Sequence, residues 1–205
     1  MSKNVELPAE ERILAAAKEV FMQKGYTGTR MQEVADVAGI NKAMLHYYFR
    51  SKEKLFRVIL TQATRVITPM ILKALSTDKG VMGKLEDFVS GHVAILLERP
   101  HLPMFIMHEL SQNQGAFMTE ILDREQIHPM VMGFFQQVIE EGQAGKIRVV
   151  NPIHLLMNTI SMTVFPFIMR PMVVKVGGIP EEMFQSILKD RKEEIIEFVQ
   201  ASLKP

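Results

Sequence analysis

The sequence predicts an all-α protein of about nine helices. Apolar residues recur three and four positions apart along almost the whole chain, whereas the period-two alternation of β-strands is nearly absent. Glycine and proline divide this pattern into segments of helical length. With 205 residues, of which 47% are apolar, the chain can bury a substantial core.

The first helix is expected to begin near Pro8, because Glu10 and Glu11 then fall in its first turn, and to end at Gly25. Its apolar spacing predicts one inward face. That face consists of Ile13, Leu14, Ala17, Val20 and Phe21.

Capping residues place the next three helices. Thr29 is expected to cap the second helix, with Gln32 reaching back to the cap, and Gly39 to end it in a left-handed conformation. Asn41 is a strong N-cap for a third helix. Ser51 has the same role for a fourth, long helix that continues to about residue 77.

The remainder of the chain predicts further helices near 81–98, 103–113 and 116–142, with a kink in the last of these at Pro129. Asn151 and Pro152 form an N-cap with proline at the first helical position, which predicts a helix of about 20 residues. A final helix is expected over 181–203.

Composition excludes several classes of function. Without cysteine the chain has no disulfide, thiolate metal site or cysteine nucleophile, and a reducing, cytoplasmic setting is expected. The first twelve residues lack the apolar core of a signal peptide. The apolar run 153–176 contains His154, Asn158 and Arg170, which are costly in hydrocarbon, so a buried helix and no membrane partner are expected.

No motif predicts catalysis. A glycine-rich phosphate loop, a nucleophile elbow and a paired metal motif are all missing from the sequence, which predicts a protein that is not an enzyme and has no cofactor. His101 and His108 are seven residues apart, but Pro103 interrupts a shared helix face and no carboxylate completes a metal site.

Positive charge is concentrated in one segment. The whole chain has a net charge of only +1, yet residues 24–57 contain seven Lys and Arg against three Asp and Glu. Local basicity beside a slightly acidic remainder is typical of a segment that meets an anion, although a solvated surface has the same composition.

The stretch VADVAGINKAMLHYYFRSKEKLF, residues 34–56, predicts a helix-turn-helix, the unit whose second helix enters the DNA major groove. At 100° per residue, Leu45 and Phe49 lie on one side of the second helix and can pack inward. Lys42, Ala43, His46 and Tyr47 then face outward, where they suit phosphates and base edges. The alternative is an ordinary surface with half-buried tyrosines and a solvated lysine.

The segment ERILAAAKEVFMQKGYTGTRMQEVADVAGINKAMLHYYFRSKEKLF, residues 11–56, resembles the DNA-binding domain of the tetracycline-repressor (TetR) family of bacterial regulators. It covers about a quarter of the chain. Three separated elements carry the resemblance: FMQKGY, VADVAGI and LHYYFRSKEKL.

The resemblance implies a role for each matching position. Thr29 and Arg30 are expected to approach a phosphate. Base edges are expected to meet Lys42, Ala43 and Met44, and backbone anchoring is expected of Tyr47, Tyr48 and Lys52. Asn41 and His46 complete the predicted DNA-binding set. Met44 stands where a small polar residue is common in the family, and it can meet a thymine methyl but cannot donate a hydrogen bond.

For the rest of the chain the resemblance implies a helical domain that dimerises and often holds a small-molecule cavity. We therefore expect a DNA-binding domain over residues 1–57 and a ligand-binding and dimerisation domain over 58–205. A two-fold homodimer suits a major-groove reader of this size. The last helix offers an apolar stripe for the interface, which otherwise packs within its own subunit: Met183, Phe184, Ile187, Leu188, Ile195 and Phe198.

The 16 methionines and 12 phenylalanines favour a deformable apolar cavity, although core filling explains any single one of them. His108 and Asn158 are expected as polar contacts within it. The other predicted lining residues are Met104, Phe105, Met107, Met162 and Phe165.

Together these features predict a ligand-responsive transcriptional repressor that binds a palindromic operator as a homodimer and is released by a small apolar or amphipathic molecule. Residues 58–77, as part of one long helix, are expected to link the two functions. Two alternatives remain: a helical carrier or enzyme with an unused DNA-binding module, and a protein whose apolar stripes recruit another subunit.

Overall fold

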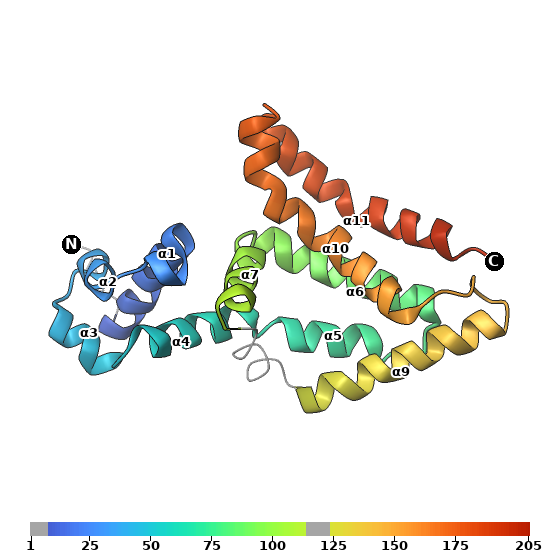
Figure 1. Cartoon of the computed structure of the whole chain (residues 1–205), viewed down its shortest axis with the longest axis horizontal. Helices are drawn as coiled ribbons and strands as arrows, with labels where there is room; N and C mark the ends of the chain where they lie inside the picture. Colours follow the sequence, from blue (N-terminus) through green and yellow to red (C-terminus); the bar gives the residue numbers. More distant parts are fainter. Residues whose placement is uncertain (1–7, 114–123) are drawn as a thin grey trace, which may run out of the picture. The chain divides into compact units, whose positions relative to one another are not determined.

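The structure is a computed structural model that describes residues 8–113 and 124–205. Within these ranges the chain is helical and has no β-strand, which confirms the all-α prediction. Among the described residues, contacts divide the chain into an N-terminal unit, residues 8–64 and 105–113, and a C-terminal unit, residues 65–104 and 124–205 (Figure 1).

The N-terminal unit contains α1 (Ala9–Gly28), α2 (Met31–Ala38), α3 (Lys42–Tyr48) and α4 (Lys52–Thr64). Helices α2 and α4 pack against α1, and α3 packs against α2. The apolar face predicted for the first helix turns inward, with Ile13 and Ala17 completely buried. The buried residues of the other helices in this unit include Val34, Leu45, Leu55, Phe56 and Leu60.

Helix α1 is interrupted at Gly25 and does not end there. Gly25 has φ 66° and ψ 179°, while a short helical stretch continues to Gly28. A positive φ is open to glycine at little cost and disfavoured for residues with a Cβ atom. The glycine was therefore correctly identified as a break, but the helical segment is three residues longer than predicted.

The predicted cap of the second helix is wrong by one residue. Thr29 belongs to the end of α1, and Arg30 is the N-cap of α2. The carboxylate that reaches back is that of Glu33, whose Oε2 accepts from Arg30 N at 3.4 Å. Gln32 instead donates to Asp36 one turn further on.

The predicted end of α2 and the predicted caps of α3 and α4 are confirmed. Asn41 Oδ1 accepts from Met44 N at 2.8 Å, and Ser51 Oγ accepts from Lys54 N at 3.1 Å. Gly39 has φ 66° and ψ 37°, the left-handed conformation expected at the end of α2. These contacts fix the turn before α3 and the start of α4.

The predicted long fourth helix is two helices. Helix α4 ends at Thr64, and α5 (Ile67–Leu75) begins after a turn at Arg65 and Val66. The Thr64 hydroxyl donates to Leu60 O at 2.7 Å. The link between DNA-binding and ligand-binding functions is therefore not one uninterrupted helix, as the sequence pattern suggested.

The C-terminal unit continues with α6 (Val81–Glu98), α9 (Arg124–Gln143), α10 (Pro152–Pro171), a π-helical turn η1 (Met172–Val176) and α11 (Glu181–Leu203). Helix α7 (Leu102–Asn113) begins in this unit and from Phe105 onward groups with the N-terminal unit. The predicted bounds of α6 and α11 are confirmed. The first part of the segment predicted as 116–142 lies outside the described residues.

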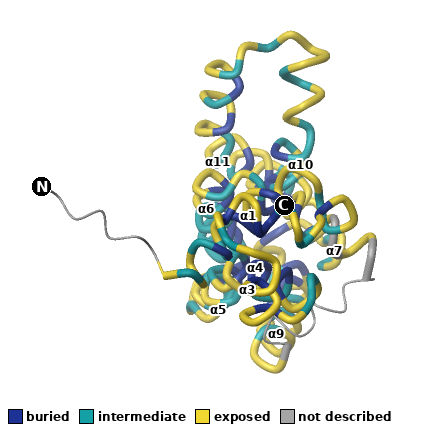
Figure 2. The backbone as a smooth tube through the Cα atoms, turned by 90° about the vertical axis from the view of Figure 1, so that its left-hand side faces the viewer, coloured by how far each residue is buried: buried dark blue, intermediate teal, exposed yellow. Residues whose placement is uncertain are grey.

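The core of the C-terminal unit lies where α6 meets α5, α10 and α11. Buried residues from these helices and from α9 form this core. They include Val81, Leu85, Val89, Phe134, Val138, Ile195 and Val199. Buried and exposed positions alternate along the tube of α11 (Figure 2). A smaller cluster of Leu96, Phe167, Phe184 and Leu188 fills the space between α6 and the α10–α11 hairpin.

Polar contacts fix the ends of these helices. Glu141 of α9 accepts from Val81 N at 3.1 and 3.2 Å, which caps α6 from a distant part of the chain. Asn151 caps α10 as predicted, accepting from Ile153 N at 2.9 Å. At the other end of α10, Arg170 pairs with Glu181 at 2.9 Å and ties α10 to the start of α11.

Within residues 8–113 and 124–205, two stretches are long and apolar enough to cross a membrane by length and composition: Lys52–Leu75 and Pro152–Val176, with mean hydropathies of 1.3 and 1.4. The first is broken by the turn between α4 and α5. The second buries one face in the C-terminal core through Leu155, Thr159, Thr163 and Phe167. Core helices pass the same test, so neither stretch by itself indicates a membrane protein.

Candidate nucleic-acid interface

Helices α2 and α3 form a helix-turn-helix whose inner face is apolar. Val34, Ala35 and Ala38 of α2 are buried, and Gly39 turns the chain toward the Asn41 cap of α3. On α3, Leu45 is completely buried and Phe49, just past its end, is 6% exposed. The inward direction of both residues agrees with the helical-face argument.

The opposite face of α3 is open to solvent. Lys42, Ala43 and His46 are exposed, and the Tyr47 side chain is 82% exposed. Tyr48 packs edge-on against Tyr47, with ring centroids 5.5 Å apart, and Met44 lies on the exposed surface beside them. This short helix thus has only one fully buried side chain. It also carries an ammonium, an imidazole, two phenols and a thioether.

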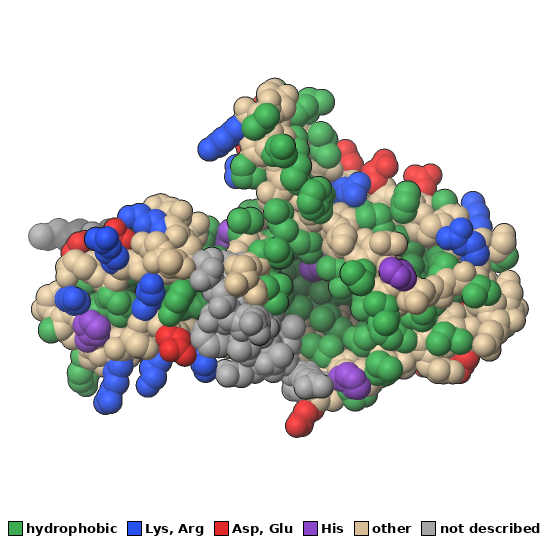
Figure 3. All heavy atoms as spheres, in the orientation of Figure 1, with side chains coloured by type: hydrophobic (Ala, Val, Ile, Leu, Met, Phe, Trp, Pro, Cys, Tyr) green, Lys and Arg blue, Asp and Glu red, His purple; other side chains and the backbone are tan. Residues whose placement is uncertain are grey.

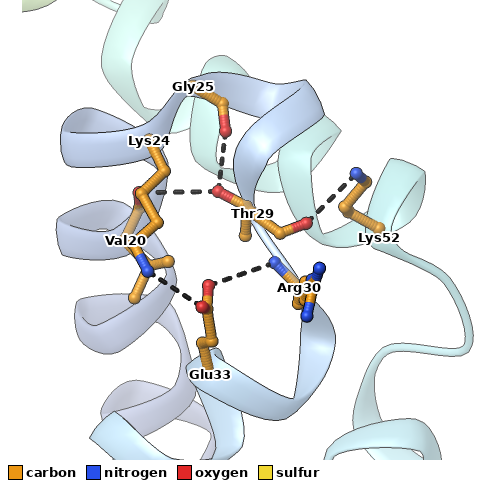
Figure 4. Close-up of polar contacts among 7 residues, drawn as sticks. All are labelled: Val20, Lys24, Gly25, Thr29, Arg30, Glu33 and Lys52. Carbon is orange, nitrogen blue, oxygen red and sulfur yellow. Dashed lines mark hydrogen bonds and ion pairs between the residues drawn. The ribbon is translucent and has the colours of Figure 1, made fainter.

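Lys and Arg side chains are spread over the surface of the N-terminal unit (Figure 3). Some of them are paired with carboxylates: Arg57 with Glu53 at 3.4 Å and Lys24 with Glu33 at 2.8 Å. The hydrogen bond from Lys24 holds the pKa of the Glu33 carboxyl below its usual value. The same carboxylate receives Arg30 N, so Glu33 joins the end of α1 to the start of α2 (Figure 4). Glu33 follows the Arg30 cap by three residues, which is the spacing of a capping box and could have indicated this role.

Thr29, predicted at a phosphate, faces the interior. It is 2% exposed, and its hydroxyl donates to Gly25 O at 2.7 Å (Figure 4). This corrects the prediction for its side chain, because the only hydroxyl proton is used within the unit. Arg30, the next residue, is exposed and stays in the candidate interface.

Lys52 also differs from its predicted role. Its ammonium donates to Tyr26 O at 2.9 Å and to Thr29 O at 3.2 Å. It also lies 4.5 Å from the centroid of the Tyr26 ring. These contacts fit neither a lysine that is free to bind a phosphate nor a lysine that is simply solvated. The sequence does not indicate them, because the acceptor carbonyls are 23 and 26 residues away along the chain.

The family model for "Bacterial regulatory proteins, tetR family" matches residues 13–59, the segment that forms α1 to α4 up to Ile59. Curated proteins similar to this chain are named as helix-turn-helix transcriptional regulators. The chain is a TetR-family regulator.

Two curated relatives extend this similarity beyond the helix-turn-helix. The transcriptional regulator RutR of Escherichia coli K12 is 27% identical over 156 residues, which are 72% of this chain and 68% of RutR. The transcriptional repressor NicS of Pseudomonas putida is 46% identical over 137 residues, 65% of this chain and 63% of NicS. A DNA-binding transcriptional regulator is thus the function that this TetR-family chain shares with its relatives.

The fold of this TetR-family regulator is also that of a solved protein–DNA complex. AibR, crystallised with isovaleryl coenzyme A and operator DNA, has a TM-score of 0.61 at 20% identity, covering 78% of this chain and 86% of AibR. The relatives are named as regulators and not as enzymes. Among the described side chains, no three His, Asp or Glu residues form a group that could hold a metal ion.

The predicted dimer residues of this TetR-family regulator divide into two sets. Phe184, Leu188 and Ile195 are at most 3% exposed and belong to the subunit's own core, which corrects the prediction for them. Met183, Ile187 and Phe198 are 54%, 46% and 62% exposed. The single stripe of the sequence is therefore two adjacent stripes on α11, one buried and one open.

Helix α10 adds exposed apolar side chains to the open stripe of α11. We call the combined set the α10–α11 apolar face (Figure 3). On α10 and η1 it comprises Ile153, Met157, Ile160, Phe165 and Met172, and on α11 it comprises Met183, Ile187 and Phe198.

The described part of the chain places the residues predicted for a ligand cavity in different surroundings. Asn158 and Met162 line a groove of about 490 Å³ between α10 and α11, together with Phe198, Ser202 and Arg148. Met104, Met107 and Phe165 are about half exposed. Phe105 is 6% exposed and stacks on Phe56 in the N-terminal unit. The side chain of His108 lies outside the described residues.

A partly buried polar pair in the C-terminal unit was not predicted. His92 Nδ1 lies 2.9 Å from the Thr163 hydroxyl oxygen, and that hydroxyl donates to Ile160 O at 2.8 Å. Because threonine has only one hydroxyl proton, the imidazole must donate from Nδ1. Burial lowers the pKa of His92 to about 4, so the ring is neutral at ordinary pH.

Proposed function

We propose that this chain is a ligand-responsive repressor that binds a palindromic operator as a homodimer in the bacterial cytoplasm. In this proposal residues 1–57 contact DNA, whereas residues 58–205 dimerise and respond to a small molecule. Two findings support this division. The relative NicS is named as a repressor, and AibR was crystallised with both isovaleryl coenzyme A and operator DNA.

One observation carries the DNA-reading part of the proposal: the outer face of α3 is open although it is rich in large side chains. Tyr47 is 82% exposed, and Lys42 and Ala43 lie beside it. A small residue allows close approach to base edges, while lysine and tyrosine suit phosphates and bases. The proposed contact set is Arg30, Asn41, Lys42, Ala43, Met44, His46, Tyr47 and Tyr48.

The α10–α11 apolar face supports the homodimer. Its members are open in a single subunit, and large exposed apolar patches mark interaction surfaces. A two-fold axis brings the same patch of both subunits together, and two helices from each subunit then form a four-helix interface. Because the groove beside Phe198 belongs to this face, we assign it to the partner subunit and not to the small molecule.

Ligand response requires two states with different affinities for the ligand. We assign the link to α7, because this helix begins in the C-terminal unit and stacks Phe105 on Phe56 of α4 at 5.8 Å. A ligand that shifts α7 would then change the setting of α4 and of the helix-turn-helix. This route replaces the uninterrupted helix that the sequence suggested.

The decisive experiment is selection of binding sites from a random-sequence duplex pool by the full chain at near-physiological salt, where nonspecific phosphate binding is weak. We expect an enriched motif with two-fold symmetry. A folded protein that enriches no sequence contradicts the base-reading proposal. An enriched motif without symmetry contradicts the homodimeric arrangement alone.

The enriched duplex then serves as the probe for ligand response. A library of small apolar and amphipathic compounds is screened for release of the duplex, and each active compound is tested with a Phe105→Leu variant. We expect some compounds to lower duplex affinity of the natural chain and to act more weakly on the variant. Compounds that bind the protein without changing duplex affinity contradict ligand-released repression.

A further inference from the structure

Lys52 holds the protein's own backbone. Its Nζ donates to Tyr26 O at 2.9 Å and to Thr29 O at 3.2 Å, and it faces the Tyr26 ring at 4.5 Å. An ammonium has three donors and no acceptor, so two carbonyls and a ring face occupy most of its binding capacity. We call this arrangement the Lys52 clasp.

The clasp joins the two ends of the helix-turn-helix. Thr29 immediately precedes Arg30, the N-cap of α2, and Lys52 is the first residue of α4. The 30–51 segment between them contains α2, the turn at Gly39, and α3. The hydrogen bond from Lys52 to Thr29 O therefore closes a loop around both helices of the DNA-reading element (Figure 4).

The acceptor side of the clasp is firmly held. Thr29 is 2% exposed, and its hydroxyl bonds to Gly25 O at 2.7 Å. The Tyr26 ring packs against Phe56, which is 2% exposed, with centroids 5.0 Å apart. Lys52 thus ties the start of α4 to a part of the core with little freedom, and the closed loop has fewer arrangements than an open one.

We propose that Lys52 is a positioning residue that closes the helix-turn-helix and sets the orientation of α3, and that its effect on DNA binding comes from this placement and not from a phosphate contact. The proposal rests on the base-reading role of α3 proposed above. It assigns to Lys52 a contribution to sequence discrimination, although the side chain itself reads no base.

The test compares two duplexes of equal length, the one enriched from the random pool and one of scrambled sequence. Phosphate contacts act on both duplexes alike, whereas a displaced α3 loses base contacts on the enriched duplex only. We expect Lys52→Met to weaken the enriched duplex about tenfold, the order of one lost base contact, and the scrambled duplex much less.

Lys52→Arg separates the two roles. Arginine is a strong phosphate ligand, but its planar, larger guanidinium does not match a site formed by two carbonyls and a ring around a compact ammonium. The clasp predicts that Lys52→Arg loses discrimination as Lys52→Met does. If Lys52 is instead a phosphate anchor, Lys52→Arg preserves binding and Lys52→Met weakens binding of both duplexes equally. Lys52→Met then also lowers the slope of log affinity against log salt concentration by about 0.9. That result overturns the proposal.

Lys54→Met is the matched control, because Lys54 is an exposed lysine on the same helix whose ammonium is outside the clasp. We expect it to preserve the ratio of the two affinities. The hydrogen-exchange rates of the α3 backbone amides provide a second readout. We expect these rates to rise in both Lys52 variants and to stay the same in Lys54→Met. If both Lys52 variants unfold the whole chain, the effect is not confined to the 30–51 segment and the proposal is overturned.

Failure of the clasp and failure of base reading give different results. If the natural chain binds both duplexes equally, α3 does not read bases and the proposed function fails. If the natural chain discriminates and both Lys52 variants keep that discrimination, the clasp fails while base reading stands.

Discussion

At the scale of single residues, we propose that the α3 face has some positions that contact phosphates and others that contact base edges. Tyr47 is 82% exposed and suits a phosphate, whereas Lys42 and Met44 are proposed at base edges. We expect Tyr47→Ala to weaken all duplexes by a similar factor and Lys42→Ala or Met44→Ala to change base preference. Selection from a random pool with each variant measures both effects, and equal loss of discrimination in all three contradicts the assignment.

His92 gives a prediction for stability. Its pKa is about 4 in the folded chain and 6.5 ordinarily, so between pH 6.5 and pH 4 the unfolded chain binds more protons. The free energy of unfolding is therefore expected to fall as the pH drops through this window, by at most about 1.4 kcal/mol per pH unit from this group, and to be unaffected by it above pH 6.5.

Urea unfolding at pH 7.5, 6.5 and 5.5 tests this expectation. His92→Gln is the comparison, because its amide can still donate to Thr163 but does not titrate. If the free energy of unfolding depends on pH equally in the natural chain and the variant, His92 is protonated as readily in the folded state as in the unfolded one, and the expectation is wrong.

Local residues of the candidate site were predictable, and distant contacts were not. Asn41, Leu45 and Phe49 follow from capping rules and helical periodicity, which depend only on near neighbours. Thr29 and Lys52 were misplaced because their partners are fixed by tertiary packing. Nothing in the sequence around Lys52 indicates that Tyr26 O and Thr29 O lie within reach of its ammonium.

At the scale of elements, the turn between α2 and α3 depends on one backbone conformation. Gly39 has φ 66°, and a Cβ atom at this position would meet open space, so any loss on substitution is conformational and not steric. We expect Gly39→Ala to lower the free energy of unfolding by about 1–2 kcal/mol. Gly39→Asn is the control and should lose less, since asparagine visits the left-handed region more readily. Urea midpoints measure the difference, and equal stability of the three proteins would contradict it.

Helix ends were predictable where the sequence carries capping residues. Asn151 and Pro152 begin α10, and Asn41 begins α3, as expected from their side chains. The break between α4 and α5 has no such signal, because Arg65 and Val66 are ordinary helical residues and the nearest proline, Pro69, lies inside α5. Helical periodicity and capping rules therefore give no signal for the end of α4 at Thr64.

At the scale of the whole molecule, the α10–α11 apolar face is expected to hold two subunits together. Phe198 is 62% exposed on this face. We expect Phe198→Glu to weaken the dimer at least about thirtyfold, as for a central aromatic anchor, and analytical ultracentrifugation measures the dissociation. Met132→Glu on α9, where the side chain is 50% exposed, is the matched control. A monomeric natural chain, or equal effects of both variants, would remove this face as the interface.

The division of α11 into a core side and an open side could not be read from the sequence. Met183 and Phe184 are neighbours, as are Ile187 and Leu188, and each pair is equally apolar. The second member of each pair is buried because α6 and α10 lie on that side. Apolar periodicity indicates that a helix has an inner face. Which residues of a broad apolar stripe are buried in the subunit and which stay exposed depends on where the neighbouring helices lie.

The stack of Phe105 on Phe56 has a practical consequence for building hybrid regulators. A fusion joined at the turn after Thr64 would transplant α1 to α4 but leave Phe56 facing the corresponding residue of a foreign α7. A graft that keeps this pair must take two pieces of the donor, the helices up to Thr64 and the part of α7 from Phe105 onward. The smallest exchangeable module of this protein is therefore discontinuous in the gene that encodes it.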